Sequence, residues 1–255
     1  MGSIAVKAVL LNSGGIVSQS LIKSYEHSAV ASQRVLTMAA DKAGLATADI
    51  EVIAVTNAGV DEVPVAHKSV SEVRATVSGV QWFFPNARTI LSMGAEKFIG
   101  IQCIDAGAVG KFATNDKCAS GSGSFLEIMA SILEVEIEKM GELSLKASNK
   151  VEITSQCAVF AESDVVGYVH RGIKKADILM GVHEAVAANG FSILNRIGIE
   201  EDIILTGGVA KNAGVVDALE RRLGTKVWVP ADPEFSGALG AAVIARDSAG
   251  PRRQA

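Results

Sequence analysis

A chain of 255 residues is long enough to form one large domain or two smaller lobes around a substantial buried core. Its net charge of −4 at pH 7 leaves no basic face, which argues against a nucleic-acid partner. The sequence has no apolar run of transmembrane length and no signal-peptide pattern, and its three cysteines cannot all pair. We therefore expect a cytoplasmic protein and neither a membrane protein nor a secreted disulfide scaffold.

The first part of the chain alternates strand and helix patterns. Residues 4–11 predict a strand, 12–15 a tight turn, and 16–24 a returning antiparallel strand. Apolar residues at helical spacing then predict a helix over 28–44, with Gly44 as its C-cap. The next expected elements are a buried strand at 50–56 and a helix at 69–81.

The middle of the chain repeats the order of strand, small-residue turn and strand. Residues 89–95 predict a strand ending in a glycine turn, and 98–104 is expected to pair with 110–115. The helices expected next lie at about 122–134, 158–172 and 175–197. The last elements are a strand at 202–206, a helix ending at Leu223, a strand at 226–229 and a helix at 237–246. Interleaved strands and helices with a repeated hairpin predict α/β architecture in two similar lobes.

Glycine turns are the candidate ligand sites of such an architecture. In α/β folds, ligands commonly lie between the carboxyl ends of strands and the N-termini of helices. Four segments qualify, namely Gly2-Ser3, Gly94-Ala95, Gly207-Gly208 and the run 237–240. Each alone is an ordinary connection, but together and in this order they predict a bound ligand.

Two cysteines lie in matching positions, each directly before a helix pattern. Cys118 and Cys157 would meet the positive end of a helix dipole, which favours thiolate over thiol. Cys103 lies in an apolar strand pattern, which favours a buried structural thiol. The matching pair is either inert core or a set of metal ligands. A cubane iron–sulfur cluster usually takes four thiolates, so two chains giving two each would be the economical arrangement. The four histidines show no metal-ligand spacing, and we expect them on the surface or in helix packing.

With these features the chain resembles the ATPase family that activates 2-hydroxyacyl-CoA dehydratases and forms the ATPase subunits of benzoyl-CoA reductase. The resemblance covers residues 2–245. It rests on the motifs GSIAVK (2–7), WFFPN (82–86), NDKCASG (115–121), CAVFAES (157–163), TGGVAKN (206–212) and GALGAA (237–242). The two cysteine motifs in combination are specific to this family, whereas the glycine motifs alone indicate only its superfold.

The resemblance implies the two-lobed α/β fold of acetate and sugar kinases, Hsp70 and actin, which is ribonuclease H-like. The first lobe would comprise residues 1–88 and 237–255. The second lobe, 89–236, would carry the cluster cysteines, and an ATP cleft would lie between the lobes.

The resemblance also implies an ATP-binding iron–sulfur subunit that couples ATP hydrolysis to low-potential electron transfer to a CoA-thioester reductase or dehydratase. Its cofactors would be ATP or ADP, Mg²⁺, and a 4Fe–4S cluster that is shared between two chains and bound by Cys118 and Cys157. Its partners would be a second ATPase subunit, identical or not, the reductase or dehydratase component, and reduced ferredoxin or flavodoxin as electron donor.

The nucleotide-binding residues implied by the resemblance are Ser3, Ala5, Lys7, Gly94, Ala95, Gly207, Gly208, Asn212 and Glu234. Lys7 would reach phosphate oxygens as a point charge, and the paired glycines at 207–208 would let the backbone approach the nucleotide. Glu234 stands where the family has another polar side chain. The alternative for Lys7 is a solvated lysine on an edge strand, and the alternative for Gly207-Gly208 is a plain tight turn.

The sequence departs from the family at two acidic positions. The family's first motif begins with an aspartate two residues before the glycine, where this chain has no residue. Its second phosphate motif has an acidic residue where this chain reads Ser92-Met93-Gly94-Ala95. Such carboxylates organise Mg²⁺ and the attacking water, so we expect hydrolysis to be weakened more than binding. Either the native start lies upstream of Met1, or this subunit has reduced hydrolytic power, like the smaller ATPase subunit of a benzoyl-CoA reductase.

Two other functions stay open at this point. A small-molecule kinase of the same superfold would need a catalytic aspartate beside a substrate pocket and would not need the cysteines. A non-hydrolysing structural subunit would only complete a shared cluster site for an active partner. The sequence does not identify catalytic residues.

Overall fold

The computed structural model describes residues 4–23, 28–57, 63, 66–104, 108–115, 122–154 and 157–249. The chain divides into two compact units: a first unit of residues 1–86 and 235–255, and a second unit of residues 87–234. The lobe boundaries expected from the sequence lie between 88 and 89 and between 236 and 237. The assignment of functional lobes stays a prediction.

The first unit is built on an antiparallel hairpin of β1 (Ala5–Asn12) and β2 (Gly15–Lys23). The hairpin closes through a two-residue turn, in which the N–H of Gly14 donates to Oδ1 of Asn12 at 2.8 Å. Aspartate, asparagine and glycine are the residues that such tight hairpin turns favour. The strand, turn and strand predicted for residues 4–24 are confirmed up to Lys23, and residue 24 lies outside the described residues.

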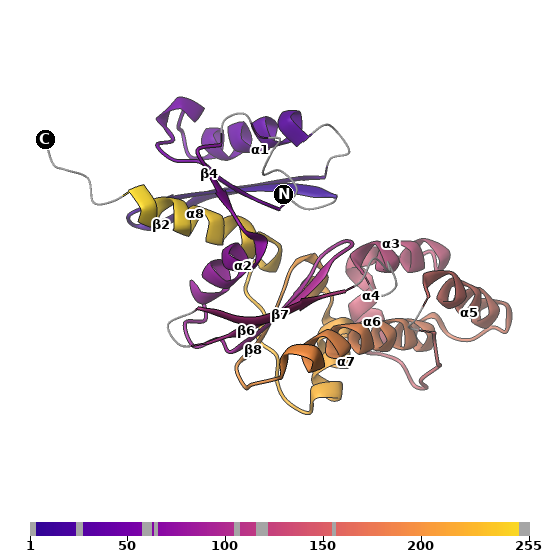
Figure 1. The fold of residues 1–255 in the computed structure, drawn as a ribbon. Helices are drawn as coiled ribbons and strands as arrows, with labels where there is room; N and C mark the ends of the chain where they lie inside the picture. The colour runs from indigo at the N-terminus through magenta and orange to yellow at the C-terminus, as the bar shows by residue number, and fades with distance from the viewer. Residues whose placement is uncertain are drawn as a thin grey trace, which may run out of the picture. The chain divides into compact units, whose positions relative to one another are not determined.

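The two faces of β1 pack against different helices, α1 (Ser28–Lys42) and α8 (Ser236–Ala249). Val6 packs with α1, whereas Val9 packs with Leu239 of α8. Side chains along a strand point alternately to its two faces, so the odd-numbered residues of β1 share the α8 face. Figure 1 shows the hairpin between these two helices.

Helix α8 also crosses α2 (Glu72–Gln81) at very short range. A Cβ added at Gly79 would collide with the backbone of α8, and one added at Gly240 would collide with the carbonyl group of Ala75. The run 237–240 is therefore not a glycine turn. It lies inside α8, and Gly240 serves the close packing of two helices, which corrects the expectation of a turn. A ligand contact of this segment stays a prediction.

The second unit contains a four-stranded sheet in the order β7-β6-β5-β8. Its strands are β5 (Thr89–Met93), β6 (Phe98–Cys103), β7 (Val109–Thr114) and β8 (Ile203–Thr206). The strands β5, β6 and β7 form an antiparallel meander, and β8 runs parallel to β5. The strand pairings predicted within 89–115 and the strand at 202–206 are confirmed. The turn expected at 105–107 lies outside the described residues.

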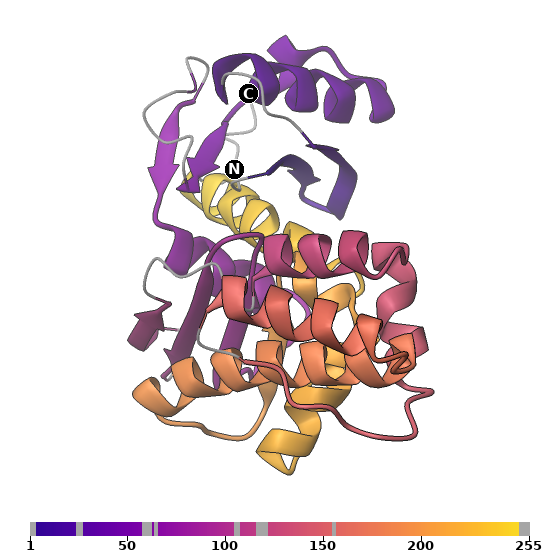
Figure 2. The same ribbon diagram turned by 90° about the vertical axis from the view of Figure 1, so that its right-hand side faces the viewer.

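The described residues of the second unit also form the α-helices α3 (Gly123–Ile132), α4 (Met140–Ser144), α5 (Ala158–His170), α6 (Lys175–Ile197) and α7 (Ala213–Leu223). The long helix α6 packs against the sheet, and α7 lies along α6 (Figure 2). The apolar core joins residues of the sheet to all of these helices. The bounds of α6 are those expected from its sequence pattern. None of the described helices combines the length and apolar character that a membrane-spanning segment requires.

Three local predictions are wrong. The strand expected at 50–56 shortens to β3 (Ala54–Thr56), which pairs in parallel with β4 (Lys68–Val70). The helix expected from 69 begins later, because a serine N-cap accepts the N–H of its third residue. The segment 226–229 forms only a single bridge to β8.

The crossing of α2 and α8 makes a first prediction. We expect Gly240→Ala to lower the free energy of unfolding by about 1–3 kcal/mol, because the added methyl group has no space beside Ala75. Gly237→Ala on the same helix is the matched control, since a Cβ there would have no neighbour within 4 Å. Chemical denaturation measures both variants. Equal stability of the two would contradict the packing role of Gly240.

Candidate functional site

Two glycine turns lie side by side at one edge of the sheet in the second unit. Gly94 follows β5 directly and Gly207 follows β8, and these parallel strands are paired up to Ser92 and Thr206. Gly207 has a φ of 87°, and a Cβ there would collide with the backbone of Met93. Positive φ and this close approach both require glycine at position 207.

Gly208 has the opposite environment. A Cβ added there would have no neighbour within 4 Å, so the backbone at this position borders open space. The preceding residues are fixed, because the hydroxyl of Thr206 donates to the carbonyl oxygen of Pro233 at 2.8 Å. The N–H of Gly207 donates to the same oxygen at 3.0 Å. The turn is therefore rigidly held, while one of its two glycines leaves room for a ligand.

The Gly94-Ala95 turn is tied to the start of α3, the helix that follows the Cys118 segment. The N–H of Gly123 donates to the carbonyl oxygen of Gly94 at 3.0 Å. The N–H of Ser124 donates to the carbonyl oxygen of Ala95 at 2.9 Å. These are two of the N–H groups at the helix start that have no partner within the helix. The turn expected to bind phosphate and the first turn of α3 are thus joined backbone to backbone.

The residues expected in the first phosphate motif, Ser3, Ala5 and Lys7, belong to the first unit. Ala5 and Lys7 are part of β1, and Lys7 shares its face with Val9, which packs against α8. Ser3 lies outside the described residues. Their contacts with phosphate stay a prediction.

Asn212 is the N-cap of α7. Its Oδ1 accepts the N–H groups of Gly214 at 3.0 Å and Val215 at 3.3 Å, and its Nδ2 lies 3.1 Å from Nε2 of His183. Such a cap stabilises a helix by about 1 kcal/mol. Both polar atoms of the side chain therefore have partners in the protein, and a direct contact with nucleotide stays a prediction.

Glu234 follows Pro233, whose carbonyl oxygen holds the turn at Gly207. The two carboxylate oxygens of Glu234 differ in their hydrogen bonding. Its Oε1 pairs with Nζ of Lys211 at 2.7 Å, and its side chain is only 11% exposed. Among the described residues, Oε2 has no hydrogen-bond partner although it is buried. A buried carboxylate oxygen without a donor is costly, so this atom marks a place where a hydroxyl or amino group of a ligand would be stabilising.

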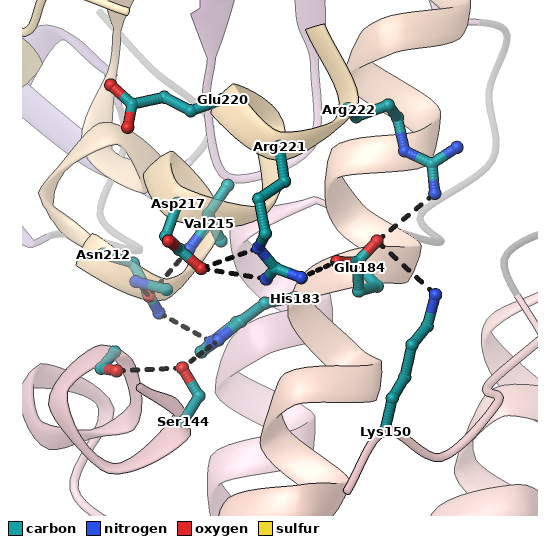
Figure 3. A network of polar contacts seen from close by, with 12 residues as sticks. Ser144, Lys150, His183, Glu184, Asn212, Val215, Asp217, Glu220, Arg221 and Arg222 are labelled. Atoms are coloured by element: carbon teal, nitrogen blue, oxygen red, sulfur yellow. Dashed lines mark hydrogen bonds and ion pairs between the residues drawn. The ribbon is translucent and has the colours of Figure 1, made fainter. Parts of the chain in front are cut away.

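His183, which no sequence pattern singled out, is only 1% exposed. Figure 3 shows it beside Asn212, the residue that caps α7. His183 lies on α6, with its Nδ1 2.8 Å from Oγ of Ser144 and its Nε2 facing Asn212. Burial lowers its pKa from 6.5 to about 3, so the ring is neutral at pH 7. The expectation that the histidines lie on the surface or in helix packing is confirmed for this one, whose ring also makes two hydrogen bonds.

A cavity of about 190 Å³ opens beside this histidine, between α4, α6 and α7. Its polar lining includes Asp217 and Arg221. Arg221 bridges two carboxylates, with NH2 2.9 Å from Oδ2 of Asp217 and NH1 2.6 Å from Oε1 of Glu184. Figure 3 shows that Lys150 and Arg222 also reach Glu184. These ion pairs connect α6 with α7 and with the segment before α5.

Cys157 directly precedes α5 and carries a free, half-buried thiol. The first turn of α5 has no acidic residue, and its apolar side chains Val159 and Phe160 are 66% and 64% exposed. Cys118 lies outside the described residues. Within the described part of the chain, no group of three or more His, Cys, Asp or Glu side chains gathers as a metal site. One described thiol therefore lies at a helix start with an exposed apolar rim.

Cys103 is also a free thiol, but it is buried where Cys157 is partly exposed. It lies in β6 with 1% of its surface exposed, and burial raises the pKa of its thiol to about 11. A thiol with so high a pKa is not a reactive thiolate at neutral pH. The prediction of a buried structural cysteine is confirmed.

The fold defines the class of protein. The chain has the α/β fold of sugar kinases, Hsp70 and actin, and a ROK family glucokinase from Streptomyces griseus in complex with glucose and AMPPNP superposes with a TM-score of 0.56. That similarity covers 97% of each chain at 14% identity and shows the fold alone.

The sequence assigns the family. The chain belongs to the BadF/BadG/BcrA/BcrD ATPase family, whose model matches residues 1–245. It is 38% identical to the 2-hydroxyisocaproyl-CoA dehydratase activator of Clostridioides difficile over 98% of this chain and 94% of that protein. A solved structure of this activator with bound ADPNP superposes with a TM-score of 0.93 over 98% of this chain and 93% of that one. One of the subunits of benzoyl-CoA reductase from Thauera aromatica is 32% identical over 80% of this chain and 74% of that protein. The predicted family and fold class are thus confirmed.

The paired glycines make a second prediction. Gly207→Ala should lower the free energy of unfolding by roughly 2–3 kcal/mol or more, because it combines an unfavourable φ with a collision at Met93. Gly208→Ala should leave stability nearly unchanged and weaken binding of Mg·ADP, because its methyl group projects into the space left for ligand. Denaturation and calorimetric titration measure the two effects. A Gly208→Ala variant that binds Mg·ADP like the wild type would contradict this placement of the ligand.

His183 makes a third prediction, which concerns pH. In the unfolded chain its imidazole takes up a proton below about pH 6.5, whereas in the folded protein it does so only near pH 3. The folded state is therefore destabilised as pH falls through this window, by roughly 1.4 kcal/mol per pH unit. Between pH 7 and pH 5 the wild type should lose about 2 kcal/mol more stability than His183→Gln. Equal losses would mean that His183 titrates normally in the folded protein.

Proposed function

We propose that this chain is an ATP-binding iron–sulfur subunit that couples ATP hydrolysis to low-potential electron transfer to a CoA-thioester dehydratase or reductase. Membership of an ATPase family and likeness to dehydratase activators and to a benzoyl-CoA reductase subunit support this proposal. The structural observation that carries it is the backbone connection between the Gly94-Ala95 turn and the start of α3.

The nucleotide part of the proposal rests on the edge of the sheet where β5 and β8 end. The phosphates would lie against the Gly94-Ala95 turn and against Gly208, where the backbone borders open space. The buried Oε2 of Glu234 would accept a hydrogen bond from a hydroxyl or amino group of the nucleoside. Mg²⁺ would accompany the nucleotide and share its phosphate oxygens.

The coupling part rests on hydrogen bonds. A phosphate bound at Gly94-Ala95 contacts a turn whose carbonyl oxygens hold the N–H groups of Gly123 and Ser124. Any displacement of this turn between nucleotide states would therefore be passed to α3, which follows the Cys118 motif in the sequence. A ligand that binds two arrangements of this element unequally shifts the population between them.

The cluster part rests on the setting of Cys157. A half-buried free thiol at the start of a helix without acidic residues in its first turn fits a ligand of an anionic cluster. The exposed Val159 and Phe160 fit a site that a second chain covers. Cys118 and Cys157 from each of two chains would supply the four thiolates of a 4Fe–4S cluster. The cluster, when bound, supplies one-electron redox chemistry, with reduced ferredoxin or flavodoxin as the proposed donor.

One observation favours a second candidate function. The second phosphate motif reads Ser92-Met93-Gly94-Ala95, with no carboxylate to orient Mg²⁺ and the attacking water. A chain that binds nucleotide and holds half of a cluster site, but leaves hydrolysis to a partner subunit, is consistent with this motif. Steady-state ATPase activity measured for the chain alone and with added partner subunit separates the two functions.

The leading proposal makes a fourth prediction. Protein purified without oxygen should contain iron and show cluster absorbance, and Cys157→Ala should remove both, because each chain would lose one of its two thiolates. Cys103→Ala is the matched control, since this buried thiol lies in β6 and should leave the iron content unchanged. Iron analysis and visible absorbance provide the measurements.

Activation of a dehydratase or reductase component by ATP completes the experiment. The wild type and Cys103→Ala should support electron delivery, and Cys157→Ala should not. Wild-type protein that contains no iron, both alone and with a second ATPase subunit, would contradict the proposal. Activation by Cys157→Ala equal to that by the wild type would contradict the role of Cys157 as a cluster ligand.

A further inference from the structure

We propose that His183 is a positioning residue of the nucleotide site, which acts through Asn212 on the glycine turn at 207–208. The inference rests on the proposed nucleotide function of that turn. It concerns Ser144 of α4 and His183 of α6, which would act on the nucleotide site through Asn212 and not by touching the nucleotide.

A directed chain of hydrogen bonds runs through these helices (Figure 3). Oδ1 of Asn212 accepts backbone N–H groups of α7, so its Nδ2 is the atom that faces His183 and donates to Nε2. Since Nε2 accepts, the neutral ring carries its proton on Nδ1, which donates to Oγ of Ser144 at 2.8 Å. The hydroxyl of Ser144 in turn donates to the carbonyl oxygen of Gly141 at 2.8 Å. Every donor in the chain meets one acceptor.

These hydrogen bonds exclude the other neutral tautomer of His183. A proton on Nε2 would face the amide protons of Asn212, so the amide would have to turn its Oδ1 towards the ring. That rotation would break both cap hydrogen bonds to Gly214 and Val215. Ser144, by accepting the proton on Nδ1, therefore selects the tautomer that permits the cap.

The packing around the ring leaves little freedom. His183 is 1% exposed, and a Cβ added at Gly214 would collide with its Nδ1 and with Oγ of Ser144. Helix α7 can approach α4 and α6 this closely only because position 214 has no side chain. A small error in the ring position is thus transmitted to the start of α7.

The start of α7 is also the end of the nucleotide turn. Asn212 closes the 3-10 helix Gly208–Lys211, with its own N–H donating to the carbonyl oxygen of Val209 at 3.0 Å. The same residue thereby ends one element and caps the next. Fixing its side chain fixes the backbone between Gly207, which is anchored to Pro233, and α7. His183 holds this second end of the segment.

The test compares variants of the chain of hydrogen bonds with a control outside it. His183→Phe keeps a ring but removes both hydrogen bonds, and Ser144→Ala removes only the acceptor that selects the tautomer. His183→Gln restores an acceptor for Asn212. Arg221→Gln is the control, because it breaks the ion pairs of Arg221 with Glu184 and Asp217 and leaves the hydrogen bonds of His183 unchanged.

Calorimetric titration with Mg·ADP gives the first readout. We expect His183→Phe to weaken Mg·ADP binding at least tenfold and Ser144→Ala to weaken it about threefold. His183→Gln should recover part of the loss seen in His183→Phe. Arg221→Gln should bind within twofold of the wild type. Affinities of His183→Phe and Ser144→Ala within twofold of the wild type would overturn the inference. So would a loss in Arg221→Gln equal to theirs, which would indicate a general effect of loosened helix packing.

Nitrogen NMR of the imidazole gives a second readout that does not depend on binding. The wild type should show a protonated Nδ1 and an unprotonated Nε2 at pH 7, and Ser144→Ala should shift the population towards the other tautomer. An Nε2-protonated ring in the wild type would overturn this inference but not the proposed nucleotide function. Wild-type protein with the expected tautomer but no affinity for Mg·ADP would instead overturn the proposed function and, with it, the positioning role.

Discussion

The close approach of the turns after β5 and β8 is the constraint on which the candidate site depends. Gly207 brings its backbone against that of Met93, which no other residue type could do at its positive φ. Pairing of the two parallel strands up to Ser92 and Thr206 leads both turns to the same edge of the sheet. Ligands of α/β folds bind at such edges because backbone N–H groups and helix starts converge there.

This edge connects outwards in two directions. On one side, the carbonyl oxygens of the Gly94-Ala95 turn hold the first N–H groups of α3, and α3 follows the first cysteine motif. On the other side, the turn after Gly207 ends in Asn212, which caps α7 and contacts His183. Both connections are made of hydrogen bonds with defined donors, so each has few alternative arrangements. A site built in this way transmits small displacements instead of absorbing them.

The two described cysteines lie in contrasting environments. Cys103 is enclosed in the sheet, where burial raises the pKa of its thiol and keeps it protonated. Cys157 begins a helix at the surface, beside exposed apolar side chains. Only the second setting offers a thiolate ligand a helix dipole and room for a partner chain. The two glycines differ in the same way: a Cβ at Gly240 would collide with Ala75, whereas one at Gly208 would point into open space.

The sequence by itself determined the elements with strong local periodicity and the motifs with unusual residue spacing. The hairpin at 4–24, the meander at 89–115 and the full length of α6 were predictable, because each depends on neighbours within a few residues. Tertiary structure alone decided three other features: the strand β4, the role of Gly240, and the contact of His183 with Asn212. These depend on groups far apart in the chain, 29 residues for the last pair, and no local pattern encodes which of them meet.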